Sequence, residues 1–318
     1  MLALLLIACA LLALVLFGRV PVDALWANDL NNFAHGPVFG VLTLIVLFFL
    51  RRGPTRGSGW LLEYTIAFGA ALLLGVAVEA VQSRIGRDAE VGDVLRDALG
   101  ALAALGFLAT IDPKLRAALP RRRRLIGGTM VGVAGTALLL APLVVAALSY
   151  RDRQRNFPVI ADFDRPYSNY FVGALGGAET RPAALPRWLV GHAQETRALH
   201  VKSSGVRWWG VKIREPRSDW HGFNRLAITI ANPSRKPLDL QLRLYNARVD
   251  DEGEAESRFA TKFQVAPSSW ATSTIPLEAF TVPGGAASFD IGDVQSLMLA
   301  RSGGTESAEF YLVRIWLE

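Results

Sequence analysis

Polar side chains interrupt three apolar stretches in the first half of the chain, and their types suit acid–base or metal chemistry. His35 lies near the start of one stretch, and Glu79 and Gln82 end the next. Asp93 and Asp97 begin the stretch that follows. Imidazole and carboxylate groups transfer protons near neutral pH or bind divalent cations. Ionisable groups within apolar helices therefore mark a candidate site for a polar ligand.

The spacing of these residues groups them on helix faces. Glu79 and Gln82 are three residues apart and Asp93 and Asp97 are four apart, so each pair shares one face. Two neighbouring carboxylates repel each other unless a cation or a shared proton lies between them, and Arg87 and the histidine are available partners. The alternative is a structural hydrogen-bond cluster that ties three helices together, or polar groups that rest at the membrane surface.

Five apolar stretches predict the helices that position this cluster. A helix needs about 20 apolar residues to cross about 30 Å of hydrocarbon. The chain has 318 residues, of which 51% are hydrophobic and 19% charged, which disfavours most soluble cytosolic enzymes. The first stretch lacks the basic start of a signal peptide, so we interpret it as a retained helix. The predicted transmembrane helices are 2–17, 34–50, 60–81, 94–111 and 125–148.

Loop charges predict the orientation of these helices. Positive residues concentrate at 51–56 and 114–124, which places those two loops in the cytoplasm. The N-terminus is then inside, and the chain after residue 150 is outside the cytoplasmic membrane. The polar cluster consequently lies at the outer face.

Charge and cysteine content exclude other classes. The net charge is +6, and much of the excess in the first half belongs to Arg121 to Arg124, beside a predicted membrane helix. The charge therefore does not indicate nucleic-acid binding. A single cysteine, Cys9, excludes an internal disulfide framework and a zinc site with several thiolates.

The first half also resembles the VanZ-like membrane proteins. The resemblance rests on 31–35 (Asn-Asn-Phe-Ala-His), on 79–82 (Glu-Ala-Val-Gln) and on Arg87 followed by Asp93, Asp97 and Gly100, and it covers about residues 15–111. Asn31-Asn32 stands where the family usually has Asp-Lys, and Asp97 where it usually has Asn. The resemblance implies a bacterial cytoplasmic-membrane protein in a family named for teicoplanin resistance, and it carries over no catalytic role.

Residues 158–318 change to the period of β-strands, after a predicted juxtamembrane linker at 150–157. Leucines alternate with polar residues from Leu238 to Leu244, which is typical of a half-buried strand. The other predicted strands are 197–203, 206–214, 224–231, 258–265, 269–275, 294–300 and 308–317. We therefore expect a multidomain chain in which a bundle of five transmembrane helices precedes an all-β sandwich of jelly-roll type.

This second half is similar to galactose-binding-like and carbohydrate-binding modules, on the residues 161–164 near its start and 309–315 at its end. Sugars stack on exposed aromatic rings while polar neighbours bind their hydroxyls. Alternation assigns Trp209 to the core and Trp208 to the surface. The other candidate ligand-binding residues are Trp220, His221 and Tyr170. For each aromatic residue, ordinary packing in the core is the alternative.

Calcium in the β-sandwich is a further expectation. The carboxylates that would hold it are Asp162, Asp164, Asp250 and Asp251, although their spacing is not that of an EF-hand.

Three functions remain open. The first is a bacterial envelope protein that presents its sandwich to a glycan, a peptidoglycan component or a protein partner. The second is an integral-membrane enzyme or lipid-handling protein that acts on a lipid-linked headgroup at the polar cluster. The third is a structural or assembly role. The sequence identifies neither the ligand nor the oligomeric state.

Overall fold

The computed structural model describes residues 1–318 apart from 19, 21, 23, 54–56, 86–89, 189–195, 204, 206, 207, 247–257, 281–289 and 303–307. The described chain forms two compact units, Met1–Ala146 and Ala147–Glu318. The first is helical and the second is an antiparallel β-sandwich, which confirms the predicted fold class.

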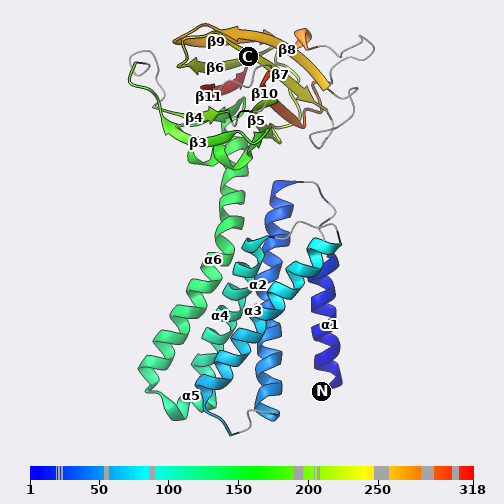
Figure 1. Ribbon diagram of the computed structural model, residues 1–318, viewed down its shortest axis with the longest axis vertical. Coiled ribbons are helices and arrows are strands. Elements are labelled where there is room, and N and C mark those ends of the chain that lie inside the picture. Colours follow the sequence, from blue (N-terminus) through cyan, green and yellow to red (C-terminus); the bar gives the residue numbers. More distant parts are fainter. Residues whose placement is uncertain are drawn as a thin grey trace. The chain divides into compact units, whose positions relative to one another are not determined.

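The helical unit contains apolar helices joined by short connections (Figure 1). Among the described residues, α2, α3, α4 and α6 are long and apolar enough to cross a membrane. The prediction of five such helices needs correction, because α1 has only 16 residues and is a shorter apolar helix. The helices are α1 (Leu2–Phe17), α2 (Leu25–Arg52), α3 (Trp60–Arg84), α4 (Val91–Ile111), α5 (Pro113–Ala118) and α6 (Arg121–Asn156).

Two helices extend beyond their predicted ends. α2 begins at Leu25 and therefore carries His35 well inside the helix rather than at its start. α6 continues to Asn156, so most of the predicted linker at 150–157 is helical. Both extensions contain polar residues. The prediction missed them because it was based on the lengths of apolar stretches, which end where polar residues begin.

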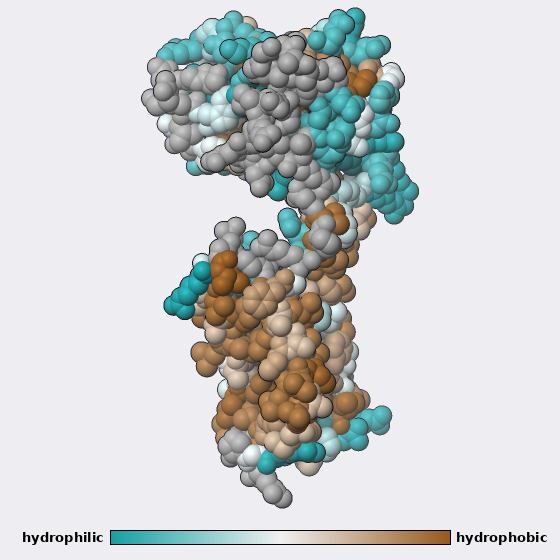
Figure 2. Space-filling view, turned by 90° about the vertical axis from the view of Figure 1, so that its right-hand side faces the viewer, coloured by the Kyte–Doolittle hydropathy of each residue, from teal (hydrophilic) through white to brown (hydrophobic). Residues whose placement is uncertain are grey.

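Large apolar side chains cover the outside of the helical unit (Figure 2). Leu61, Leu73 and Val91 are 63%, 74% and 89% exposed. Soluble proteins rarely present such a continuous apolar surface to water. This surface is compatible with a membrane protein.

Glycine allows α2 and α4 to approach each other closely. A methyl group on Gly100 would overlap the carbonyl oxygen of Gly36, and one on Gly40 would lie 3.0 Å from the carbonyl oxygen of Gly100. α3 closes on the same region, because a methyl group on Gly75 would lie 2.6 Å from Oδ2 of Asp97. The three helices that carry the candidate cluster therefore converge.

The second unit is a sandwich of two antiparallel sheets. Among the described residues, the six-stranded sheet has the order β3-β4-β11-β6-β9, with β1 also paired to β11. The five-stranded sheet has the order β2-β5-β10-β7-β8. The strands are β1 (Val159–Asp162), β2 (Val172–Leu175), β3 (Glu179–Ala184), β4 (Arg197–Lys202), β5 (Trp208–Arg214), β6 (Arg225–Asn232), β7 (Leu238–Tyr245), β8 (Arg258–Val265), β9 (Ser269–Pro276), β10 (Ser296–Ser302) and β11 (Glu309–Leu317).

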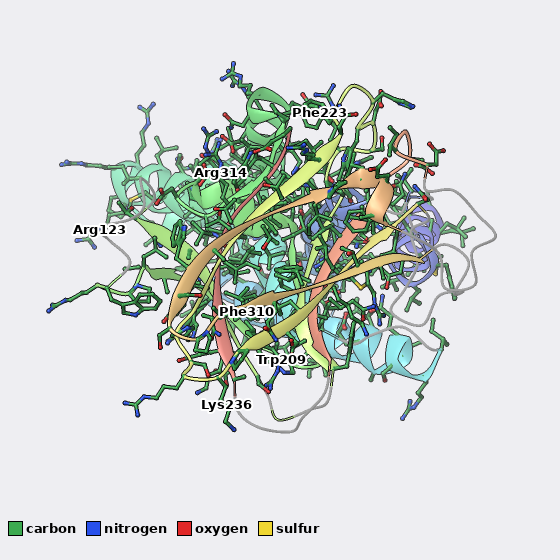
Figure 3. All side chains as sticks on the ribbon, turned by 90° about the horizontal axis from the view of Figure 1, so that it is seen from above. Arg123, Trp209, Phe223, Lys236, Phe310 and Arg314 are labelled. Carbon is green, nitrogen blue, oxygen red and sulfur yellow. The ribbon has the colours of Figure 1, made fainter. Side chains whose placement is uncertain are left out.

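The core of this unit lies between the two sheets. Trp209 of β5 is fully buried and its ring centroid lies 5.8 Å from that of Phe310 on β11 (Figure 3). The inward leucines of β7 belong to the same cluster, as their alternation predicts. The strands β1, β2 and β3 were absent from the sequence prediction.

Replacement of Trp209 tests this assignment of the core. We expect Trp209→Ala to lower the free energy of unfolding of the fragment 147–318 by about 3–5 kcal/mol, since it removes a fully buried aromatic side chain. Chemical denaturation followed by circular dichroism measures the change. The half-buried Trp208 is the control, and a larger loss for Trp208→Ala would show that the faces of β5 are reversed.

Candidate functional site

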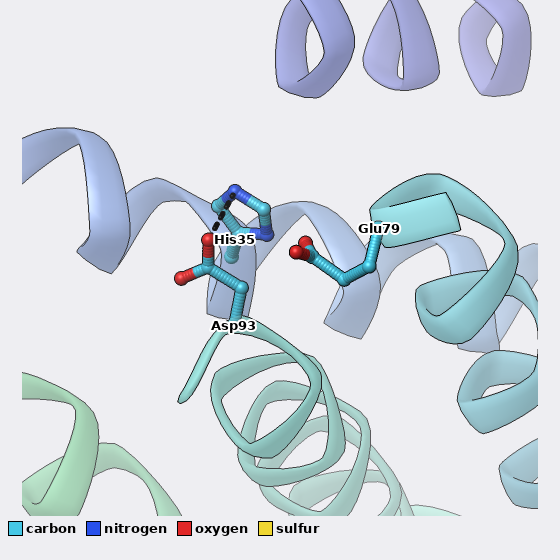
Figure 4. Close-up of side chains that lie close together, drawn as sticks. All are labelled: His35, Glu79 and Asp93. Carbon is cyan, nitrogen blue, oxygen red and sulfur yellow. Dashed lines mark ion pairs between the residues drawn. The ribbon is translucent and has the colours of Figure 1, made fainter. Parts of the chain in front are cut away.

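The polar cluster of the helical unit lies where α2, α3 and α4 meet (Figure 4). His35, Glu79, Asp93 and Asp97 are buried, with exposed fractions between 0% and 7%. Nδ1 of His35 lies 3.2 Å from Oδ1 of Asp97, and Nε2 lies 3.8 Å from Oδ2 of Asp93. One potential ligand atom from each of His35, Glu79 and Asp93 lies within 4.8 Å of the others. The structure thus brings together four of the predicted residues.

Neighbouring groups hold the carboxylates in place. Oε2 of Glu79 accepts a 2.8 Å hydrogen bond from the backbone N–H of Glu90. Arg96 donates to Oδ1 of Asp93 one turn earlier on α4. Arg96 is therefore a cation of this cluster that the sequence pattern did not single out.

One described member of the predicted set, Gln82, contacts a different helix. Nε2 of Gln82 donates a 3.2 Å hydrogen bond to the carbonyl oxygen of Val15, so this amide joins α3 to α1. Arg87 lies outside the described residues. Three-residue spacing from Glu79 defines a helix face but not the helix that contacts it, so this contact could not be predicted from the spacing.

A second buried network lies at the opposite ends of the same helices, and sequence analysis missed it. Glu63 and Asp112 are completely buried. Arg51 donates to both carboxylates, with Nε 2.9 Å from Oε2 of Glu63. Lys114 also donates to Glu63, and Tyr64 donates a 2.8 Å hydrogen bond to Asp112. Two of the loop cations used to predict orientation are thus ion-pair partners.

The outward side of the five-stranded sheet carries the predicted aromatic residue. Trp208 is half-buried and packs against Leu175, Tyr245, Met298 and Ala300. The guanidinium of Arg243 lies 3.9 Å from the centroid of the Trp208 ring.

The other predicted ligand-binding aromatics differ in their exposure. Trp220 is fully buried, and its Nε1 donates a 2.7 Å hydrogen bond to the carbonyl oxygen of Arg217. The interpretation of Trp220 as an exposed platform is therefore corrected: it is a core residue. Tyr170 is half-buried in edge-on contact with Tyr150 and Phe171.

The remaining candidates are polar. His221 is exposed, and its Nδ1 lies 2.7 Å from Oδ1 of Asp219. Asp164 accepts hydrogen bonds from the backbone N–H groups of Thr196 and Arg197, so its carboxylate fastens the start of β4.

Of the other three carboxylates proposed for calcium, only Asp162 belongs to the described residues. Asp162 lies 3.4 Å from Nε of Arg165. Asp250 and Asp251 lie outside the described residues.

A cavity of about 520 Å³ in the second unit was not predicted. Arg153 lines it and donates to the carbonyl oxygens of Arg214 and Glu215. Its guanidinium also lies 3.2 Å from the centroid of the Phe171 ring. These contacts fasten the last turns of α6 to the sandwich.

Comparisons with known proteins yielded only structural similarities. No family model and no curated protein matches the chain. A family 11 carbohydrate-binding module from Clostridium thermocellum, solved with a β-1,3-1,4-mixed-linked tetrasaccharide, has 17% identity and a TM-score of 0.36, covering 46% of this chain and 86% of that one. The CBM22-1 xylan-binding domain of Paenibacillus barcinonensis Xyn10C has 15% identity and a TM-score of 0.35, covering 50% and 94%. An exo-β-agarase has 14% identity and a TM-score of 0.37, covering 50% of this chain and 24% of the agarase.

The buried network predicts a pH dependence. Burial alone would raise the pKa of Asp112, but hydrogen bonds from Arg51 and Tyr64 outweigh it and lower that pKa. The stabilisation is therefore present above the unfolded pKa of about 3.9 and is lost as the pH falls through the folded value.

We expect Asp112→Asn to reduce the free energy of unfolding at pH 7 by about 3–5 kcal/mol, because it leaves buried partners without their counter-charge. Thermal unfolding in detergent between pH 3 and 7 measures this loss. The difference in stability between the unchanged protein and the variant should become smaller as the pH falls. Glu90→Gln, at a side chain that is 55% exposed, is the control and should change little. Equal losses for the two variants would contradict the role given to Asp112.

Proposed function

We propose that the chain is a membrane-anchored protein of the bacterial cell envelope whose sandwich binds a glycan. The observation that carries the proposal is the aromatic–cation pair of Trp208 and Arg243 on the outward side of the five-stranded sheet. A pyranose presents an apolar face to an aromatic ring and hydroxyl groups to polar side chains. Trp208 and its neighbours combine both kinds of group.

Strand register places the polar groups on the same face of the sheet as Trp208. Met298 of β10 pairs with Arg243 on β7 and with Lys212 on β5, so these side chains lie in one row across the sheet. In the next row Ala300 pairs with Gln241, whose Oε1 accepts a 3.0 Å hydrogen bond from Arg243. Met298 and Ala300, at the centres of these two rows, are buried and belong to the cluster against which Trp208 packs.

The membrane part of the proposal rests on the helices and on loop charge. The apolar helices anchor the protein in the cytoplasmic membrane, with the lipid bilayer as a partner. Excess Lys and Arg at 51–56 and 114–124 orient those loops towards the cytoplasm. The sandwich is then extracytoplasmic and faces envelope glycans. Resemblance of residues 15–111 to VanZ-like proteins adds a peptidoglycan component as ligand and a link to glycopeptide-antibiotic tolerance.

A glycan screen on the full-length protein in nanodiscs tests the binding proposal. We expect Trp208→Ala to weaken binding of the best glycan or peptidoglycan fragment by about 1–3 kcal/mol, a range taken from aromatic stacking on nucleic-acid bases. Isothermal titration measures the difference.

The matched control is Trp316→Ala. Trp316 is also half-buried and lies 5.2 Å from the guanidinium of Arg314, but it belongs to the six-stranded sheet. Equal weakening by the two variants, or binding that survives Trp208→Ala unchanged, would contradict the assignment of the site.

Orientation has its own test. Protease added to intact spheroplasts should release a folded β-rich fragment of roughly 18 kDa, the size of such a sandwich, if the second unit is outside. Mass spectrometry identifies the fragment. Protection in intact spheroplasts with digestion only after lysis would reverse the orientation.

A second candidate function is an integral-membrane enzyme or lipid-handling protein that acts on a lipid-linked headgroup. The convergence of His35, Glu79 and Asp93 favours it, because these groups supply acid, base and charge in one buried place. Complementation separates the candidates: loss of function in His35→Ala with full function in Trp208→Ala supports the enzyme, and the reverse contradicts it.

A further inference from the structure

Three side chains of the polar cluster each have an atom in contact with a neighbouring group, and each also offers one potential ligand atom within 4.8 Å of the other two. The side chains are His35 of α2, Glu79 of α3 and Asp93 of α4 (Figure 4). This arrangement resembles that of metal ligands, whose outer partners orient them.

The histidine is oriented by Asp97. Nδ1 of His35 lies 3.2 Å from Oδ1 of Asp97, which is completely buried. A proton on Nδ1 in this hydrogen bond leaves a lone pair on Nε2, and Nε2 is the nitrogen that lies 3.8 Å from Oδ2 of Asp93. A carboxylate that orients an imidazole in this way is the usual outer partner of a metal-bound histidine.

The carboxylate of Glu79 gives a second observation that points to a bound cation. The side chain is only 7% exposed, and its Oε2 is occupied by the backbone N–H of Glu90. Its Oε1 is buried and has no hydrogen-bond partner among the described residues. A buried carboxylate oxygen without a partner costs free energy, and a cation in the centre would remove that cost.

Asp93 completes the set from the third helix. Arg96 donates to its Oδ1, and its Oδ2 faces Nε2 of His35. One nitrogen and two carboxylate oxygens thus surround the centre within 4.8 Å of one another. Two carboxylates also balance the charge of one divalent cation.

We propose that His35, Glu79 and Asp93 bind a divalent transition-metal or zinc ion, with Asp97 as the residue that positions His35. Imidazole nitrogen disfavours magnesium and calcium, which prefer oxygen ligands alone, and favours zinc or iron(II). Three protein ligands leave coordination positions open for water or for another oxygen ligand. The site lies in the helical unit and is independent of the glycan proposal.

Cobalt(II) is the probe, because its visible absorption reports the ligands of a bound ion. Full-length protein in nanodiscs is treated with a chelator, dialysed and titrated with Co²⁺, and bound metal per chain is measured by mass spectrometry. We expect one Co²⁺ bound at the cluster, and loss of its absorption bands in His35→Ala, Glu79→Gln and Asp93→Asn. Asp97→Asn should retain the ion with affinity about 10–100-fold weaker, as for other outer partners.

Glu63→Gln is the matched control, since Glu63 is also a buried carboxylate of α3 but belongs to the opposite network. It should bind Co²⁺ as the unchanged protein does. All variants are first compared by circular dichroism and size-exclusion chromatography. If a variant of a proposed ligand fails to fold, the site is tested by the other two variants. Asp97→Asn should then bind Co²⁺ more weakly, and Glu63→Gln should bind it as the unchanged protein does.

Three results would overturn the site: no Co²⁺ bound at the cluster by the unchanged protein, unchanged binding in Glu79→Gln, or equal loss in Glu63→Gln. The first would mean that a proton, rather than a metal, holds the carboxylates together.

Discussion

The close contact between α2 and α4 at Gly36 and Gly100 is the constraint on which the candidate site of the helical unit depends. No room remains there for a side chain on Gly100, so the two backbones are in contact. Residues next to these glycines on the two helices are therefore close to each other. His35 adjoins Gly36, and Asp97 lies one turn before Gly100. The hydrogen bond between His35 and Asp97 therefore depends on the contact between the two backbones. Gly75 allows α3 to approach Asp97 closely, which places Glu79 near the same residues.

Buried charged groups need partners at both ends of the three helices. An ionised group inside an apolar bundle is stable only beside a partner. At one end Arg51 and Lys114 satisfy Glu63 and Asp112 with protein cations. At the other, three carboxylates share one histidine and Arg96, and two buried oxygens stay without partners among the described residues. This shortage of positive charge distinguishes the proposed metal site from the structural network.

The sequence predicted the elements whose pattern is strong and local. Leucine alternation located β7, and long apolar runs located α2, α3, α4 and α6. The strands β2 and β3 were missed because Gly173 and Pro182 weaken their patterns, and pairing with β5 and β4 holds them in place. Trp220 was misassigned because polar neighbours suggested exposure, whereas its indole N–H finds a backbone acceptor and the ring is buried. The Arg51 network was missed because its partners are distant in sequence, up to 61 residues apart.

The most direct test of the central contact is the imidazole ¹⁵N NMR spectrum of His35 in Gly100→Ala, with Gly69→Ala as the matched control. A methyl group on Gly69 of α3 would meet nothing within 4 Å, whereas one on Gly100 would overlap α2. We expect Gly100→Ala to remove the signature of the Nδ1 hydrogen bond to Asp97 and Gly69→Ala to retain it. A His35 spectrum unchanged by Gly100→Ala would contradict the account, because the hydrogen bond would then not depend on contact between the two backbones.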